Sequence, residues 1–95
     1  MPRPIGQRVV AIRDVDAKGI NLFGFGVYEG NKTNALIAGT GLGPNPCIRL
    51  DSGEYVWGYE CWWMSEKDFL ETTPKDTPRV IVGGASNTPP IEDKP

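Results

Sequence analysis

The sequence predicts a mainly β protein, a single domain of about five short strands with one short helix near residues 65–71. Its 95 residues correspond to one domain, since most domains hold ~100 to 150 residues. Its 12 glycines and 9 prolines favour short strands joined by turns over long helices. We expect the domain to span residues 1–83 and a polar, proline-containing tail to follow at 84–95.

Two strand-like segments lie in the first third of the chain. Residues 8–15 (RVVAIRDV) are β-branched and apolar with charges at the ends, which predicts a strand covered on both faces. Residues 14–21 are polar and predict a loop, and residues 22–29 (LFGFGVYE) predict a second strand. Its alternating glycines indicate a bend, a bulge or a close approach by another backbone or a ligand, and bending is favoured in a small β domain. Alternation places Phe23, Phe25 and Val27 on one face, and Gly24 and Gly26 on the other.

A long loop and a hairpin follow. Residues 30–46 hold four glycines, two prolines and three asparagines, which predicts a loop with at most a brief pairing at 35–38. Loops of this length are often functional or mobile. Residues 47–63 (CIRLDSGEYVWGYECWW) predict a β-hairpin with its turn at 51–54. Ile48 and Leu50 point inward, so Arg49 points outward.

One helix and a last strand complete the predicted elements. Ser65 is placed to cap a helix of about two turns because Asp68 lies three residues on, and Met64 and Phe69 occupy the hydrophobic-staple positions. After a connector closed by prolines at 72–78, residues 79–82 (RVIV) predict a strand. We expect the tail to pack against another surface, for which a neighbouring subunit is one candidate.

The composition excludes several chemistries. There is no histidine, which removes the commonest general base, the Ser-His and Cys-His pairs, and nearly every zinc site that two cysteines could join. Cys47 and Cys61 form no CxxC motif, and we interpret them as reduced core residues. The alternative, a disulfide between neighbouring strands, needs an oxidising compartment. We therefore expect a protein that is not an enzyme and uses no cofactor and no metal.

Charge and hydropathy restrict the location and the partners. The chain has no apolar run of signal-peptide or membrane-span length, so we expect a cytoplasmic protein without membrane contact. The net charge of −2 argues against affinity built on many phosphate contacts. Residues 1–50 carry a charge of +3 and residues 51–95 a charge of −5. This asymmetry predicts complementary charges on neighbouring strands or subunits, or a basic, ligand-facing edge made of Arg3, Arg8 and Arg13.

The glycine-rich loop is a candidate anion site. Residues 39–43 (GTGLG) could form a nest of backbone N–H groups, although neither a GxGxxG motif with a helix behind it nor a Lys-Ser/Thr pair is present. A plain turn is the alternative. Thr40 and Gly41 are the candidate residues of this nest.

Aromatic side chains are concentrated in one segment. Five of the nine lie between residues 55 and 63, and a domain this small cannot bury all of them centrally if they occupy both faces of a strand. They either form the core, or leave one or two rings exposed as an interface or a ligand platform. Arg49, near these rings, either binds an anionic group or pairs with Asp51 or Glu54. The five are Tyr55, Trp57, Tyr59, Trp62 and Trp63.

Three segments, GQRVVAIRDV, GFGVYEG and IRLDSGEYVWGYECWW, resemble the chain of a small SH3-like β-barrel over residues 6–64. The resemblance implies a first strand that leads into a long loop, with a Gly-x-Gly-x-Tyr-x-Gly strand and a short hairpin closing the sheet. The size, the composition and the lack of catalytic groups are also similar to small accessory proteins of bacteriophages and prophages. That similarity implies a protein that binds and blocks, such as an inhibitor of host defence in the host cytoplasm, and it transfers no functional residues.

Three functional hypotheses follow. The first is a non-enzymatic binding protein that forms a homo-oligomer through its aromatic residues and tail and binds a protein or a small anionic, nucleotide-like ligand. The second is an RNA- or DNA-binding module, which the acidic isoelectric point disfavours. The third is a small enzyme that relies on carboxylates or Cys61. The candidate binding residues are Arg8, Arg13, Thr40, Gly41, Arg49, Trp57, Tyr59, Trp62 and Trp63.

Overall fold

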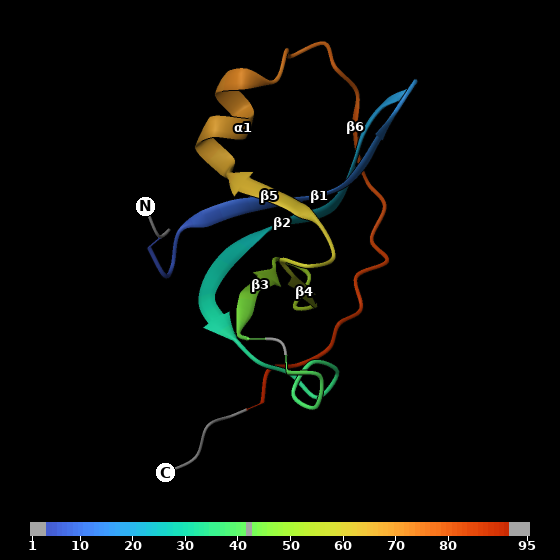
Figure 1. Ribbon diagram of the computed structural model, residues 1–95. Helices are drawn as coiled ribbons and strands as arrows, with labels where there is room; N and C mark the ends of the chain where they lie inside the picture. Colours follow the sequence, from blue (N-terminus) through green and yellow to red (C-terminus); the bar gives the residue numbers. More distant parts are fainter. Residues whose placement is uncertain (1–3, 42, 92–95) are drawn as a thin grey trace.

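A computed structural model of the protein describes residues 4–41 and 43–91 (Figure 1). Within these residues the fold is mainly β, with six strands and one short helix. Arg3 and residues 92–95 of the predicted tail lie outside the described residues. In chain order the elements are β1 (Arg8–Asp16), β2 (Gly19–Lys32), β3 (Asn45–Leu50), β4 (Tyr55–Trp57), β5 (Trp62–Ser65), α1 (Glu66–Thr72) and β6 (Arg79–Ile81).

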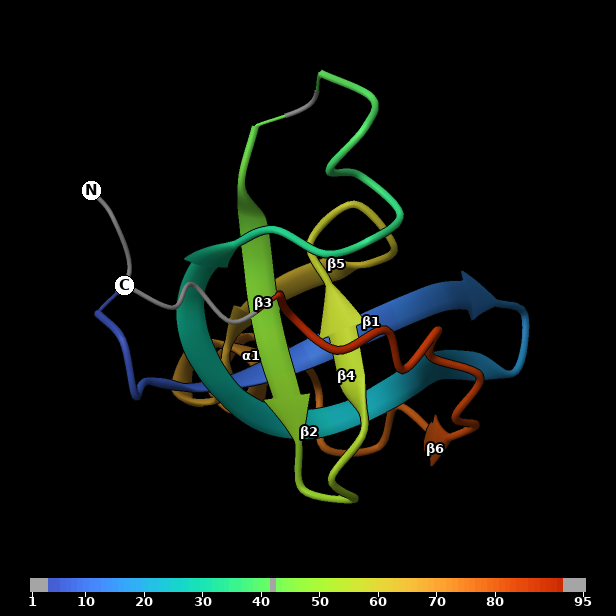
Figure 2. The ribbon, with the colours of Figure 1, turned by 90° about the horizontal axis from the view of Figure 1, so that it is seen from below.

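The strands form one curved sheet in the order β4-β3-β2-β1-β5. Neighbours along this path are antiparallel, whereas β6 pairs in parallel with the start of β2. The long strand β2 carries the curvature: its first half pairs with β1 and β6, and its second half turns across to pair with β3 (Figure 2). Among the described residues β4 and β5 remain at opposite ends of the path, so the sheet is not closed.

The predicted loop at residues 14–21 is wrong, because this segment is a tight hairpin. β1 continues to Asp16 and β2 begins at Gly19. The Asp16 carboxylate accepts from the backbone N–H of Lys18 at 2.8 Å and of Gly19 at 3.2 Å, which is how aspartate stabilises a turn. Asn21 donates to Asp14 across the hairpin at 2.6 Å. Polar residues that suggested a loop are therefore cross-strand partners.

A bulge in β2 separates two phenylalanines that alternation assigns to one face. Ala11 pairs with Gly24 and Ile12 with Leu22, so Phe23 is an extra residue in the ladder. Phe23 consequently packs in one core cluster, while Phe25 packs against the other. The expected bend is present, but the expected common face is wrong for Phe23.

The core consists of two layers on opposite sides of β1. Coverage of β1 on both faces is confirmed only for its first half, since Val15 is exposed. One layer lies inside the curved sheet and the other beneath α1. The first contains Val9, Ala11, Phe23, Tyr28, Ile48, Leu50 and Val56. The second contains Val10, Leu22 and Phe69.

Helix α1 begins as its sequence predicts. Ser65 is the N-cap, and its hydroxyl accepts from the backbone N–H of Asp68 at 3.0 Å. Met64 and Phe69 pack in the same layer, as expected for a hydrophobic staple. The cap satisfies one free amide of the first turn and positions Phe69 over the sheet.

The predicted loop at 30–46 is shorter than expected and is held by a buried asparagine. β2 continues to Lys32 and β3 begins at Asn45. Asn34 is fully buried, and its side-chain oxygen accepts from the backbone N–H of Leu36 and of Ile37, while its amide group donates to the Tyr59 hydroxyl. Residues 35–41 therefore fold as successive turns rather than as a pairing strand.

The β3–β4 hairpin is confirmed, together with the outward position of Arg49. The expected pairing of Arg49 with Asp51 is wrong. Both oxygens of Asp51 accept from the guanidinium of Arg8, at 2.7 and 2.8 Å, and Arg8 also reaches Glu66 at 3.1 Å. Curvature of the sheet brings the start of β1 beside the hairpin turn, so the bidentate partner comes from a distant part of the chain.

This ion pair predicts an acid dependence of stability. The bond from Arg8 holds the pKa of Asp51 below its ordinary value of 3.8. Because the folded-state pKa is depressed, the stabilisation is fully present above pH 3.8 and is lost as the pH falls through the folded-state pKa. In urea unfolding we expect Asp51→Asn to be less stable than the parent at pH 7, with the difference shrinking below pH 4. Asp76→Asn, in the exposed 72–78 connector, is the control; an equal loss there would contradict the prediction.

Residues 84–91 cross the outer face of β4 and form a segment that we call the strap. Trp57 points to this face, away from Val56, and is fully buried because the strap and the stacked ring of Tyr59 cover it. Its indole N–H donates to the backbone oxygen of Thr88 at 2.8 Å. The expectation that the tail packs against another surface is therefore met for its described residues 84–91, and in this chain that surface is their own domain (Figure 1).

Candidate functional site

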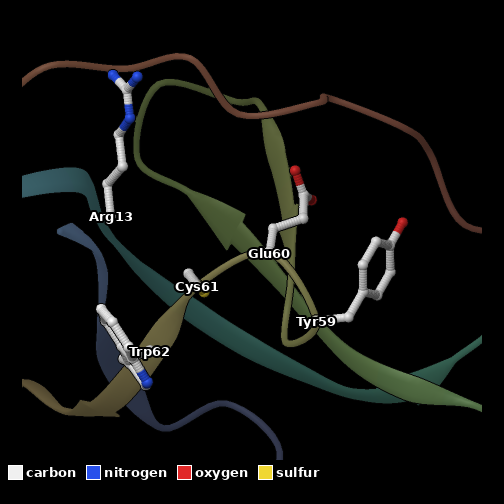
Figure 3. Close-up of a pocket in the computed structure, with 5 residues that line it drawn as sticks. All are labelled: Arg13, Tyr59, Glu60, Cys61 and Trp62. Carbon is white, nitrogen blue, oxygen red and sulfur yellow. The ribbon is translucent and has the colours of Figure 1, made fainter.

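A shallow pocket of about 270 Å³ lies between β1, which contributes Arg13, and residues 59–62, which form the turn before β5 and the start of that strand. Figure 3 shows Arg13 and Trp62 on one side and Tyr59 on the other, with Glu60 extending toward the strap between them. Cys61 lies between Glu60 and Trp62 in this view. The pocket therefore combines a cation, a carboxylate, a thiol and two aromatic rings.

Arg13 supplies the cation. Its closest carboxylate is that of Asp14 at 3.7 Å, and both side chains are about half exposed. A pair that long and that exposed contributes little, so the guanidinium is available to an anion. Arg13 also reaches the strap near Gly84, since a β-carbon at that glycine would lie 3.6 Å from a guanidinium nitrogen.

Two rings at the pocket remain in contact with water. Trp62 is 68% exposed and Tyr59 is 45% exposed, which confirms that the aromatic segment cannot be buried completely. Tyr59 is held in place by its stack on Trp57 and by its hydrogen bond from Asn34. Trp62 pairs through its backbone with Ile12, which places its side chain beside the pocket mouth.

Glu60 is a structural clamp. Its carboxylate accepts from the backbone N–H of Trp57 at 2.8 Å and from the hydroxyl and backbone N–H of Ser86 at 2.9 and 3.1 Å. These bonds join the turn after β4 to the strap.

The cysteines are free thiols. Burial, with a smaller contribution from Glu60, raises the pKa of Cys61 to about 12, and burial raises that of Cys47 to about 11. Since the thiolate is the reactive form, both side chains are poor nucleophiles near neutral pH. This favours a site that binds over one that reacts through Cys61.

The structure brings Arg13, Tyr59 and Trp62 together and separates the other predicted site residues. Trp57 is in the interior, and Trp63 is half-buried and stacks on Tyr28 with ring centres 5.1 Å apart. Arg8 is engaged by its carboxylates, and Arg49 is exposed on β3. Thr40 donates its hydroxyl to the Ile37 carbonyl, and neither it nor Gly41 is among the described residues that line the pocket.

Sequence reasoning missed the role of two pocket residues and of the strap. Cys61 was interpreted as a core residue or, in the enzyme hypothesis, as a catalytic candidate, and nothing in the sequence links Glu60 to Ser86 twenty-six positions away. The strap was missed because a polar tail gives no periodic signal.

Comparisons with protein-family models, with curated proteins and with solved structures found no match. The part of the chain that the structure describes has no helix long and apolar enough to cross a membrane. Within the same residues no three His, Cys, Asp or Glu side chains gather where they could hold a metal ion.

Proposed function

We propose that the protein is a non-enzymatic binding protein whose ligand is a planar, anionic, nucleotide-like molecule held by Trp62 and Arg13. The observation that carries this proposal is the location of a largely exposed tryptophan and an available arginine on the same side of one pocket. A planar base can stack on the indole, which contributes ~1 to 3 kcal/mol per base. A phosphate can accept the paired N–H groups of the guanidinium.

The pocket volume restricts the ligand further. Sites that enclose a drug-sized molecule measure roughly 300 to 1,000 Å³, so a pocket of about 270 Å³ accommodates one ring system and leaves the remainder in water. Such a site suits a mononucleotide better than a large cofactor. Sequestration of a nucleotide signal is the role that we propose, of the kind expected from a phage-type inhibitor acting in the host cytoplasm; a host-defence protein is the other candidate partner.

We also propose that the fold is a variant of the small SH3-like barrel. The strand order β4-β3-β2-β1-β5 supports this, because a meander of four strands is followed by a last strand that returns to β1. The curvature of β2 brings the two halves of the sheet around one core layer. The tight β1–β2 turn replaces the long loop that the resemblance implies.

Calorimetric titration of the full-length protein with cyclic and linear mononucleotides tests the ligand. We expect binding to at least one of them, weakened roughly tenfold by Arg13→Gln through loss of a charge-assisted hydrogen bond and to a similar extent by Trp62→Leu. Arg49→Gln is the matched control, because Arg49 is exposed outside the pocket, and it should leave the affinity unchanged.

The outcomes are distinct. No heat across the whole nucleotide panel would remove the small-ligand proposal. Binding of single-stranded oligonucleotides at low salt, without binding of mononucleotides, would instead favour the nucleic-acid module.

A further inference from the structure

Strand β6 lies beside the first part of β2, and among the described residues no strand pairs with its other edge (Figure 1). The Ile20 N–H donates to the Pro78 carbonyl, and the Val82 N–H donates to the Leu22 carbonyl, each at 2.9 Å. Successive residues of a strand direct their backbone groups to opposite edges, so Val80, between these two bonds, directs its N–H and carbonyl toward β2. The residues on either side of Val80 therefore direct theirs away from the sheet.

Four backbone groups, the N–H and carbonyl of Arg79 and of Ile81, form this free edge. No described residue donates to them or accepts from them. The side chains of Val80 and Ile81 are apolar and exposed, the latter at 62%. The one charged side chain of the strand does not shield the edge, because the guanidinium of Arg79 donates to the carbonyls of Thr73 and Pro74 after α1. An edge of this kind is a template for another extended segment.

Side chains of β6 line two small hollows. Side chains alternate along a strand, so Ile81 and Val80 point to opposite faces. Ile81 lines a hollow of about 120 Å³ with mainly apolar side chains, and Val80 lines one of about 90 Å³ with several polar residues. When a peptide adds to a sheet edge, main-chain bonds supply the affinity and hollows for alternate side chains supply the specificity. The apolar hollow includes Phe23, Phe25 and Leu50, and the polar hollow includes Asp16, Lys18 and Asn21.

The polar hollow contains a cation that is available to a partner. The Asp16 carboxylate is bound within its own hairpin, where it accepts from the backbone N–H of Lys18 and of Gly19 and from the Asn21 amide. The Lys18 side chain is exposed, and its ammonium group forms no ion pair with a described residue. A cross-strand pair of opposite charges is stabilising. An occupant therefore gains most from apolar side chains on the Ile81 face and a carboxylate on the Val80 face.

We propose that the free edge of β6 binds an extended segment of a partner protein in which apolar and acidic side chains alternate. The segment adds as an antiparallel strand, the slightly more stable arrangement. Its apolar side chains lie beside Ile81, and the acidic side chain between them lies on the Val80 face, where Lys18 pairs with it. A three-residue strand offers few main-chain bonds, so the association is weak and reversible. This surface is separate from the nucleotide pocket, which no β6 residue lines.

A nuclear magnetic resonance titration of the full-length protein tests the edge directly. The probe is the blocked peptide acetyl-Glu-Ile-Glu-Val-Glu-Ile-Glu-amide, added to about 1 mM to detect a weak complex. We expect the backbone amide resonances of Arg79 and Ile81 to shift and their hydrogen exchange to slow, because both N–H groups gain an acceptor. The Val80 amide, which already faces β2, should shift less. Unchanged Arg79 and Ile81 resonances at this concentration would overturn the proposal.

Backbone methylation of the peptide separates strand addition from loose apolar contact. In an antiparallel ladder the peptide residues opposite Arg79 and Ile81 exchange both bonds with them, and these are the apolar residues of the peptide. N-methylation of two apolar residues should weaken binding at least about tenfold through lost hydrogen bonds. N-methylation of two inner glutamates is the matched control and should leave the affinity unchanged, because their N–H groups face water. Equal effects of the two modifications would contradict strand addition.

Charge reversal tests the acidic side of the partner. Lys18→Glu should weaken peptide binding roughly threefold and strengthen binding of the same peptide with lysine in place of glutamate. Lys67→Glu, on the exposed side of α1, changes the net charge equally and should leave both affinities unchanged. An equal loss in Lys67→Glu would contradict the role of Lys18. Shifts of the Arg79 and Ile81 amides with protein concentration alone would assign the edge to a second copy and overturn the proposal.

Discussion

Gly26→Ala should destabilise the protein by about 3 kcal/mol or more, which is a large part of the stability of a domain this small. Gly26 lies in β2 between β1 and β3, paired with Val9 on one side and Leu50 on the other. A β-carbon there would lie 2.8 Å from the Cα atom of Leu50 and 2.9 Å from the carbonyl carbon of Arg49. These are backbone atoms of a paired strand, so the clash is relieved only by separating β2 from β3.

Urea unfolding of both proteins measures this loss. Gly39→Ala is the matched control, because no atom lies within 4 Å of its added β-carbon, and it should change the free energy of unfolding by no more than about 0.5 kcal/mol. Equal stabilities for Gly26→Ala and the parent would show that β2 and β3 can separate locally without cost.

Trp57→Ala should cost about 3 to 5 kcal/mol and release the strap. The Trp57 side chain is completely buried, at 0% exposure. Its ring stacks on that of Tyr59, and its indole N–H donates to the backbone carbonyl of Thr88. Removing it leaves a cavity under the strap and one strap carbonyl without its donor. Trp57→Phe keeps most of the apolar contact and should cost less, with the loss of the indole hydrogen bond contributing about 1 kcal/mol.

Amide hydrogen exchange distinguishes loss of the strap from global unfolding. The backbone N–H groups of Asn87 and Ile91 are bonded to Tyr55 and Thr33, so both should exchange faster in Trp57→Ala than the amides of β1 do. Trp62→Ala, at the exposed ring, should change stability by about 0.5 kcal/mol or less and leave the strap protected. Unchanged protection of Asn87 in Trp57→Ala would contradict this prediction, because the strap contacts at Glu60, Tyr55 and Thr33 would then retain the strap without the indole.

Local patterns were sufficient for the elements that depend on neighbouring residues. The β3–β4 hairpin was predictable because its turn residues and its alternation lie within one short segment. The helix was predictable because the cap and the staple act over three to five residues. The β1–β2 turn was missed because Asp14, Asp16 and Asn21 are polar, and their pairing across the hairpin is visible only once the register is known.

The candidate site depended on tertiary structure to a greater degree. The sequence singled out the aromatic segment and the arginine, Arg13, that line the pocket, but it could not separate Trp57, which is buried, from Trp62, which is exposed. The difference arises from the strap, since an outward ring on β4 is covered only when another segment crosses it. Likewise, Arg8 and Arg13 are alike in sequence, and only the curvature of the sheet brings two carboxylates to Arg8.

By itself, then, the sequence determined a small mainly β domain without histidine chemistry, because composition and short-range spacing carry that information. The tertiary structure alone decided which arginine and which tryptophan face a shared pocket and where the tail lies. The physical reason is the same in each case: exposure and pairing depend on contacts between residues tens of positions apart, which a curved sheet and a crossing strap create and which no local pattern encodes.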